Sequence, residues 1–268
     1  SWCCNPESQS DRPQLRYIGF RCRQCLECID SCPYDAVTAA GGIIHRRFEL
    51  CSGCREKGCI DKCNHDALSL SGREITPGEL TRIIALDIPF YRNSGGGVTF
   101  SGGEPLMQPA FLYSVLSQCK ELGIHTAVET CGWGSRDALQ KILPVTDLFL
   151  YDLKITDPHL HLQHTGKPVE PILSNLAFLA TQTPGIVIRL PLVPGITDTA
   201  TNIEAICTVM SESGLKRISI EPYHTLGVEK YAEHGMEYGL DDFTPYDRDQ
   251  LGFIQASFLS RGFSCEIA

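Results

Sequence analysis

The chain has 268 residues, 43% of them hydrophobic and 21% charged, and a net charge of −9, which is ordinary for a globular protein with a sizeable core. The acidic balance argues against a nucleic-acid partner, which would require a basic face, and no apolar run approaches the roughly 20 residues that span a bilayer. No signal peptide opens the chain, so its fourteen cysteines are expected to be reduced thiols in the cytoplasm.

Eight of these cysteines crowd into residues 22–63 in two runs. The first run reads C-x2-C-x2-C-x3-C-P, and the second reads C-x2-C-x4-C-x3-C. Runs of this kind hold iron–sulfur clusters, and in two-cluster proteins the fourth cysteine of each run binds the other cluster. The runs therefore predict one cluster on Cys22, Cys25, Cys28 and Cys63, and another on Cys51, Cys54, Cys59 and Cys32. Zinc, which prefers paired C-x2-C knuckles, and disulfides, which suit small secreted domains, are the alternatives.

From Ile75 onward, short apolar runs alternate with amphipathic stretches. The capping box Thr76-Pro77-Gly78-Glu79 predicts a helix that reaches about residue 87. We then expect strands at 97–101, 125–129, 148–152, 186–192, 218–221 and 265–267. Helices are expected at 109–122, 135–143, 157–166, 171–181, 202–213 and 244–261. This alternation indicates a parallel sheet built from βα units, whose functional sites lie at the carboxyl ends of the strands.

Unusual polar residues stand at these predicted strand ends. In chain order they are Ser101-Gly102-Gly103-Glu104-Pro105, Glu129-Thr130-Cys131-Gly132, Asp152-Leu153-Lys154, Arg189 within its strand, and Glu221-Pro222-Tyr223-His224. Because parallel strands end at the same edge of a sheet, we expect these groups to form one site. Cys119, Cys207 and Cys265 lie in apolar stretches instead and are expected in the core.

Five stretches, taken together and in order, carry a resemblance to a known family. They are Trp2-Cys3-Cys4-Asn5-Pro6-Glu7-Ser8, the cysteine-rich block, the stretch from Val98 to Pro105, Asp152-Leu153-Lys154, and Pro222-Tyr223-His224-Thr225-Leu226-Gly227. The chain resembles the radical S-adenosylmethionine enzymes, specifically the glycyl radical enzyme activating enzymes of the pyruvate formate-lyase activase type. The resemblance implies an α/β fold, a partial (β/α)6 TIM-like barrel with an inserted ferredoxin-like domain that holds two 4Fe-4S clusters. The implied segments are a remnant of the catalytic cluster loop at 1–17, the insert at 18–72 and the barrel at 73–268.

The resemblance also implies the activity of an oxidoreductase. One electron passes from a 4Fe-4S cluster to S-adenosylmethionine and yields methionine and a 5′-deoxyadenosyl radical. This radical removes a hydrogen atom from a glycine of a partner glycyl radical enzyme similar to pyruvate formate-lyase. Flavodoxin or ferredoxin is the expected electron donor, and a cytoplasmic monomer is the expected form, with no nucleic acid or membrane as partner.

The catalytic cluster of such enzymes is held by C-x3-C-x2-C in the loop after the first barrel strand. Here Cys3 matches the last of these cysteines, so it is the expected catalytic residue, and Trp2 and Cys4 lie beside it at the cofactor. Cys4 is not expected to bind iron. The other two ligands would precede Ser1, so we expect the first barrel strand to be missing, the intact protein to hold three clusters, and the chain as given to be inactive.

The resemblance assigns the remaining cofactor contacts to the strand ends. Gly102, Gly103 and Glu104 match the segment that meets the methionyl amino group, because glycines let backbone approach a ligand closely. Lys154, next to Leu153 in the Asp152-Leu153-Lys154 motif, can neutralise the carboxylate as a point charge. A simple Gly-Gly turn is the alternative for the first segment.

Three more assignments follow from the same resemblance. His224 matches the histidine that contacts the nucleoside part of the cofactor, and Arg189 matches a strand arginine near the cofactor. Glu129, Thr130 and Asp152 match positions that hold a monovalent cation in relatives. Structural ion pairs are the alternatives for Arg189 and Glu129.

Three other functional classes remain compatible with the sequence. A radical enzyme that acts on a small molecule would share most of the motifs. An electron-transfer protein that carries clusters would need only the cysteine-rich block. A non-catalytic scaffold that presents clusters is the third possibility.

Overall fold

The structure, a computed structural model, describes residues 2–41, 43–51, 53–240 and 244–268. Contacts within the chain divide it into two compact units. Unit 1 comprises residues 1–74 and 225–241, and unit 2 comprises residues 75–224 and 242–268. The three segments expected from the sequence, 1–17, 18–72 and 73–268, stay a prediction.

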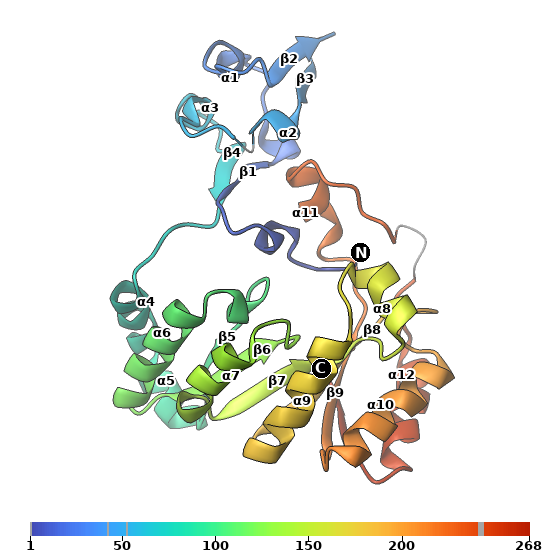
Figure 1. Ribbon diagram of the computed structural model, residues 1–268. Coiled ribbons are helices and arrows are strands. Elements are labelled where there is room, and N and C mark those ends of the chain that lie inside the picture. Colours follow the sequence, from blue (N-terminus) through green and yellow to red (C-terminus); the bar gives the residue numbers. More distant parts are fainter. Residues whose placement is uncertain (1, 42, 52, 241–243) are drawn as a thin grey trace. The chain divides into compact units, whose positions relative to one another are not determined.

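Unit 2 is built on a sheet of six parallel strands, which confirms the α/β fold expected from the sequence (Figure 1). The strands lie in the order β10-β9-β8-β7-β6-β5, so each pairs with its neighbour in the sequence. Their bounds are β5 Gly97–Phe100, β6 His125–Thr130, β7 Leu148–Asp152, β8 Ile186–Leu192, β9 Arg217–Pro222 and β10 Ser264–Ile267. Consecutive pairing of parallel strands is what repeated βα units produce.

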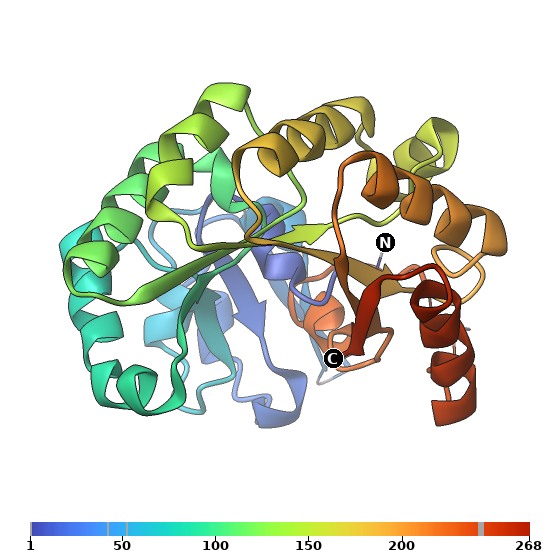
Figure 2. The same ribbon diagram turned by 90° about the horizontal axis from the view of Figure 1, so that it is seen from below.

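The helices of unit 2 lie along the outer side of this curved sheet (Figure 2). They are α4 Pro77–Ala85, α5 Ile88–Ser94, α6 Pro109–Glu121, α7 Arg136–Ile142, α8 Pro158–Thr165, α9 Glu170–Gln182, α10 Ala200–Glu212 and α12 Arg248–Leu259, with short 3-10 turns η3 Pro105–Met107 and η4 Leu143–Val145. The predicted capping box is present, because Thr76 accepts a hydrogen bond from the Glu79 amide and the Glu79 side chain accepts one from the Thr76 amide.

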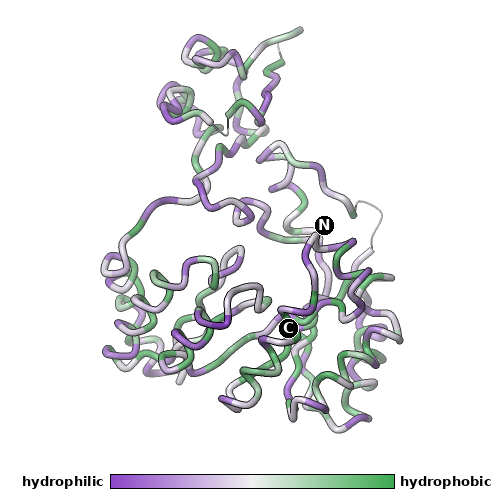
Figure 3. Tube along the Cα trace, in the orientation of Figure 1, coloured by the Kyte–Doolittle hydropathy of each residue, from purple (hydrophilic) through white to green (hydrophobic). Residues whose placement is uncertain are grey.

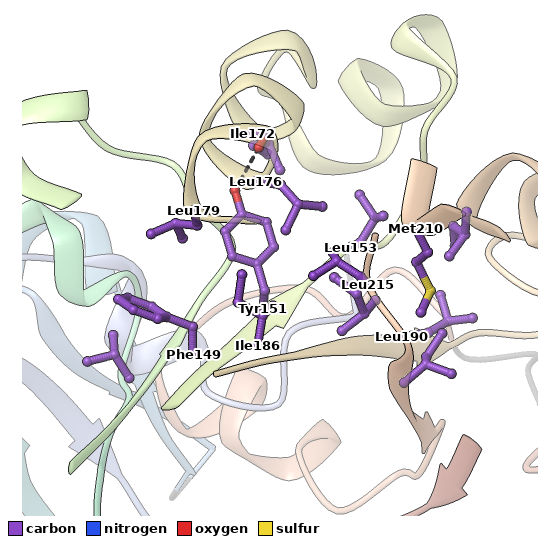
Figure 4. Packing of buried hydrophobic residues seen from close by; sticks show 14 of the residues in the cluster. Phe149, Tyr151, Leu153, Ile172, Leu176, Leu179, Ile186, Leu190, Met210 and Leu215 are labelled. Atoms are coloured by element: carbon purple, nitrogen blue, oxygen red, sulfur yellow. Dashed lines mark hydrogen bonds between the residues drawn. The ribbon is translucent and has the colours of Figure 1, made fainter. Parts of the chain in front are cut away.

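The core of unit 2 consists of strand residues packed against these helices, and hydrophobic stretches run along the strands (Figure 3). Phe149 and Tyr151 of β7 are fully buried, as are Ile188 and Leu190 of β8. The hydroxyl of Tyr151 donates to the carbonyl of Ile172 at 2.7 Å, which satisfies its only polar group inside the core (Figure 4). Cys119, Cys207 and Cys265 are buried in unit 2, as predicted.

One predicted helix start is wrong. The last long helix begins at Arg248, not at Thr244, because Asp247 is the residue that caps it. The Asp247 side chain accepts from the Gln250 amide, and the Gln250 side chain accepts from the Asp247 amide. This reciprocal cap outweighs the Thr-Pro pair, which also fits a helix start.

Unit 1 contains two antiparallel ribbons and several very short helices. In chain order its elements are η1 Pro6–Gln9, β1 Gln14–Tyr17, η2 Gly19–Arg21, α1 Glu27–Asp30, β2 Val37–Ala40, β3 Ile43–Arg46, α2 Phe48–Cys51, α3 Gly58–Asp61, β4 Leu68–Ser71 and α11 Val228–Glu233. Strand β1 pairs with β4, and β2 pairs with β3. Its small apolar core includes Cys28 and Cys59, with four further cysteines packed against it. None of the described helices is long and apolar enough to cross a membrane.

Candidate functional site

The parallel sheet of unit 2 brings the predicted polar groups to one edge. Glu104 lies just beyond β5, Glu129 and Thr130 end β6, and Asp152 ends β7. Arg189 of β8 lies opposite Asp152 of the neighbouring strand β7. Since all of these strands run in the same direction, their carboxyl ends meet at this edge, as the sequence predicted.

The carboxylate of Glu104 is the most strongly held group at the strand ends. One of its oxygens accepts from the Thr130 hydroxyl at 2.6 Å and from the Leu106 amide at 3.0 Å. The other accepts from the amide and the thiol of Cys131, at 2.9 Å and 3.0 Å. Hydrogen bonds to a charged group contribute about 1.5–3 kcal/mol each, so this carboxylate fixes the loop after β5 against the end of β6.

Cys131 takes part in this network as a protonated thiol. Burial, together with the charge of Glu104 and the hydrogen bond to it, raises the pKa of Cys131 to about 12. The thiol therefore acts as a hydrogen-bond donor at neutral pH and not as a nucleophile.

Arg189 forms ion pairs on both sides of its strand. Its Nη1 lies 2.6 Å from Glu129, and its Nε lies 2.9 Å from Glu221, which also accepts from the Ser219 hydroxyl at 2.9 Å. Burial alone would raise the pKa of Glu221, but the hydrogen bonds from Arg189 and Ser219 hold it below its usual value. Arg189 is thus a permanently charged group between two carboxylates.

Lys154 follows β7 and lies 2.9 Å from Asp152. Burial would lower the pKa of Lys154, but the surrounding negative charges, of which that of Asp152 is the largest, together outweigh burial and raise it. The backbone here is fixed by Asn202, whose amide donates to the Lys154 carbonyl at 2.9 Å and whose oxygen accepts from the Thr156 amide at 3.1 Å. The Lys154 ammonium is therefore held in place at the strand ends.

Gly102 and Gly103 precede these charged residues in the sequence, and His224 follows them. Gly102 has φ +148°, a conformation that residues with a side chain rarely adopt, and Gly102 and Gly103 are both exposed. His224 follows β9 and is exposed, while the neighbouring Tyr223 is buried and its amide donates to the Leu192 carbonyl at 3.0 Å. The segment after β5 therefore offers open backbone of the kind predicted to meet a ligand.

In unit 1 the loop that carries Cys3 is held by the segment around α11. Tyr231 donates to the Cys3 carbonyl at 2.9 Å, and the Lys230 ammonium donates to Asn5 at 2.7 Å and to Glu7 at 2.9 Å. A Cβ on Gly227 would lie 2.8 Å from the Cα of Cys4, so the two backbones meet closely. Trp2, Cys3 and Cys4 are half-buried in this loop.

The eight clustered cysteines line two cavities in unit 1. One is partly open to solvent, and its cysteines are Cys32, Cys51, Cys54 and Cys59. The other is also partly open to solvent, and its cysteines are Cys22, Cys25, Cys28 and Cys63. Each set combines three cysteines of one run with the last cysteine of the other run, which is the crossed grouping predicted from the spacing.

The spacing of these thiols bears on the alternatives to clusters. All fourteen cysteines of the chain are free thiols, so the structure contains no disulfide among them. Among the described residues, no three His, Cys, Asp or Glu side chains converge closely enough to hold a single metal ion. Zinc bonds of about 2.3 Å would draw four sulfurs to within about 4 Å of one another. The described thiols therefore do not converge as a single zinc ion requires, and sets of four thiols are the usual ligands of a 4Fe-4S cluster.

Burial raises the pKa of Cys28, Cys51 and Cys59, and the charge of Arg46 opposes this effect at all three thiols. Arg46 lies at the end of β3 and lines the cavity of Cys28. Its charge therefore favours the thiolate form that iron requires.

Comparison with known proteins identifies the family. Residues 52–206 match the model of the radical SAM superfamily. The indoleacetate decarboxylase activating enzyme of Tractidigestivibacter scatoligenes is 35% identical over 99% of this chain and 87% of that protein. The isethionate sulfite-lyase activating enzyme of Nitratidesulfovibrio vulgaris is 39% identical over 86% of this chain and 76% of that protein. The chain belongs to the glycyl radical enzyme activating enzymes of the radical SAM superfamily.

A solved structure agrees with this placement. A domain of the pyruvate-formate lyase-activating enzyme of Bacteroides vulgatus matches 65% of this chain and 99% of that domain, with a TM-score of 0.54 and 28% identity. The predicted family and the predicted α/β fold are therefore confirmed for this activating enzyme.

The three residues predicted to hold a monovalent cation have other partners in this activating enzyme. Glu129 pairs with Arg189, and Asp152 pairs with Lys154. Thr130 donates to Glu104 and accepts from the Gly132 amide at 2.9 Å. The cation site stays a prediction, and a cation there would have to compete with these two ion pairs.

Sequence reasoning missed Asn175 of α9, which braces the turn after β6. Its buried amide donates to the carbonyls of Gly132 and Gly134, at 2.9 Å and 3.0 Å, and its oxygen accepts from Arg136 at 3.0 Å. An asparagine inside an amphipathic helix pattern is the only signal the sequence offers, because its partners lie about forty residues away.

Proposed function

We propose that this activating enzyme uses S-adenosylmethionine and electrons to place a radical on a glycine of a partner glycyl radical enzyme. The groups at the strand ends of unit 2 are the main support for this proposal. The exposed backbone of Gly102 and Gly103, the ammonium of Lys154 and the guanidinium of Arg189 all lie at one edge of the sheet. A zwitterionic cofactor with a carboxylate, an amino group and a ribose requires contacts of these kinds.

Three of these groups would contact the cofactor directly. The Lys154 ammonium would neutralise the methionyl carboxylate, and its raised pKa keeps it charged for that role. The backbone at Gly102 and Gly103 would meet the amino group, with Glu104 holding the loop in place through Thr130 and Cys131. Arg189 and His224 would lie along the nucleoside part.

Iron–sulfur clusters are the second requirement. We propose Cys3 as a ligand of the catalytic cluster, with its loop held by Tyr231 and Lys230. The two four-cysteine cavities of unit 1 would hold two further clusters in a ferredoxin-like insert, and the pairing of β1 with β4 supports this because it joins the two ends of the cysteine-rich block. When bound, a reduced cluster and S-adenosylmethionine supply the radical that removes the glycine hydrogen.

The partner would be a glycyl radical enzyme that acts on a small organic compound. Relatives are named for partners of this sort, an indoleacetate decarboxylase and an isethionate sulfite-lyase. Flavodoxin or ferredoxin would donate the electrons, and we expect the enzyme to work as a monomer in the cytoplasm.

Binding of S-adenosylmethionine, measured by calorimetry on the anaerobically reconstituted full chain, tests the strand-end assignment. Lys154→Met removes the charge at the carboxylate and is expected to weaken binding about 10- to 100-fold, the worth of one charged hydrogen bond. Lys141→Met, which removes an exposed lysine of α7, is the matched control and should bind normally. Equal affinity of both variants would exclude Lys154 from the cofactor site.

The electron-paramagnetic-resonance signal of a glycyl radical on the partner tests the activity itself, in a protein that carries all three expected cysteine ligands of the catalytic cluster. The signal should depend on S-adenosylmethionine and a reductant. Cleavage of the cofactor without any radical on a partner protein would favour the small-molecule alternative.

A further inference from the structure

Arg46 stands out because most of its hydrogen-bonding capacity is unused. Its Nη2 lies 3.3 Å from the Cys28 sulfur, and its guanidinium carbon lies 4.7 Å from the centre of the Tyr17 ring. The two remaining nitrogens, Nε and Nη1, are buried and have no hydrogen-bond partner among the described residues. A buried charged donor without an acceptor is unfavourable, so this arrangement calls for an acceptor beyond those that the described residues supply.

The position of Arg46 indicates where that acceptor lies. Arg46 lines the cavity of Cys22, Cys25, Cys28 and Cys63. The cation–π contact of its guanidinium with the Tyr17 ring limits where the group can lie, and the strand pairing of Arg46 with Val37 fixes its backbone. Its N–H groups are therefore held at a wall of a cavity lined by four thiols.

The two cavities differ in positive charge. Arg23, Arg46 and Lys62 line the cavity of Cys28. Lys57 is the cation that lines the cavity of Cys59, and its ammonium already donates to the Cys51 carbonyl at 2.6 Å. A negatively charged group would therefore be stabilised more in the first cavity than in the second.

We propose that Arg46 sets the reduction potential of the cluster held by Cys22, Cys25, Cys28 and Cys63, and makes it the more easily reduced of the two clusters in unit 1. One-electron reduction adds a negative charge to a cluster, and a fixed cation with N–H groups directed at sulfur stabilises the reduced form. Electrons delivered to unit 1 then collect at this cluster before the other. This inference rests on the proposed binding of clusters in unit 1.

The test is a redox titration of the reconstituted full chain with dithionite, followed by electron paramagnetic resonance. Cys25→Ser and Cys54→Ser assign the signals to the two cavities. Arg46→Gln is expected to disfavour reduction of the first cluster by about tenfold, a shift of about 59 mV to lower potential for a one-electron couple, with a smaller shift at the second. Arg46→Lys keeps the charge with fewer donors and should shift the potential in the same direction by less. Arg73→Gln, an exposed arginine of unit 1 that lines neither cavity, is the matched control.

Each outcome decides the proposal. A shift confined to, or largest at, the first cluster in the Arg46 variants and absent in Arg73→Gln supports it. Unchanged potentials, or an equal shift in the control, overturn it while leaving cluster binding intact. If Arg46→Gln does not take up iron, Arg46→Lys gives the same decision. Iron and sulfide analysis of the wild-type chain comes first: absence of both clusters would refute the proposed function of unit 1, and this inference with it.

Discussion

The phenol oxygen of Tyr151 occupies the place where a side chain at Gly132 would begin, so a Cβ at that position would overlap it. Tyr151 cannot move away easily, because it is fully buried in the core and bonded to the Ile172 carbonyl. Gly132 also has φ +73°. The turn after β6, which carries Thr130 and Cys131, is therefore fitted directly onto the core of the sheet.

Gly132→Ala should lower the free energy of unfolding by about 3 kcal/mol, because overpacking of about 1–3 kcal/mol adds to left-handed backbone strain of about 1 kcal/mol. Gly166→Ala is a matched control, since Gly166 has φ +72° but nothing within 4 Å of its would-be Cβ. Urea unfolding of both variants measures the difference, with about 1 kcal/mol expected for the control. Equal losses of unfolding free energy in the two variants would show that Tyr151 moves aside at little cost.

Arg189→Gln should destabilise the protein in a pH-dependent way. The pKa of Glu221 is lowered in the folded state, so its contribution to stability is present above its unfolded pKa and is lost as the pH falls through the folded value. We expect a loss of about 2 kcal/mol at pH 7, reduced from the value for a fully buried pair because these groups are partly exposed. The difference from wild type should shrink below about pH 4, near the usual pKa of a glutamate.

Urea unfolding of the metal-free protein at pH 7 and at about pH 3, below the usual pKa of a glutamate, provides this measurement. Lys120→Gln breaks the more exposed ion pair with Asp147 and should cost less than about 1 kcal/mol. A loss for Arg189→Gln that stays constant with pH would mean that its ion pairs do not contribute.

Pairs of cysteine substitutions can reveal the crossed ligand sets. Cys63→Ser together with Cys25→Ser changes two residues of the same cavity, so the double variant should lose no more iron than either single variant. Cys63→Ser together with Cys54→Ser changes one residue in each cavity and should lose iron from both. Iron content after anaerobic reconstitution measures this, and the reverse pattern would mean that each run binds its own cluster.

The Cys131 thiol should resist alkylation. With its pKa raised to about 12, roughly one molecule in ten thousand carries the thiolate at pH 8. Glu104→Gln removes a negative charge beside the thiol, so the pH midpoint of its alkylation should fall and its rate at pH 8 should rise by about tenfold. Glu121→Gln, at an exposed position of α6, should have no effect.

Peptide-level mass spectrometry after brief iodoacetamide treatment of the metal-free protein follows this thiol among the others. Labelling of Cys131 as fast as the exposed Cys25 would contradict the assigned role as a donor to Glu104.

The sequence predicted the sheet of unit 2 well because its strands are strongly apolar. Ile186, Ile188 and Leu190 are buried, and helices between the strands begin at recognisable caps such as Ser135. That the polar residues gather at one edge of the sheet could be predicted from the shared direction of the strands alone. Which of these groups pair with one another did not follow, because the contact of Arg189 with Glu129 and Glu221 depends on the twist and order of separate strands.

Unit 1 was harder to predict because it has little regular structure. Its strands are four residues long, too short for a hydrophobic period to be recognised, and thiols supply part of its apolar core. The helix α11 was not predicted at all, and its contact with the Cys3 loop joins residues more than two hundred positions apart.

Unit 1 is formed by two segments that are far apart in the sequence, so it cannot be produced as one continuous fragment. A fragment that stops at Glu74 would lack Glu233, which pairs with Arg16 at 2.7 Å, and His234, which lies 2.8 Å from the Ser71 hydroxyl. Transplanting the cysteine-rich region into another scaffold would require both segments, joined by a linker in place of the sheet. Unit 1 is a module in space without being a module of continuous sequence.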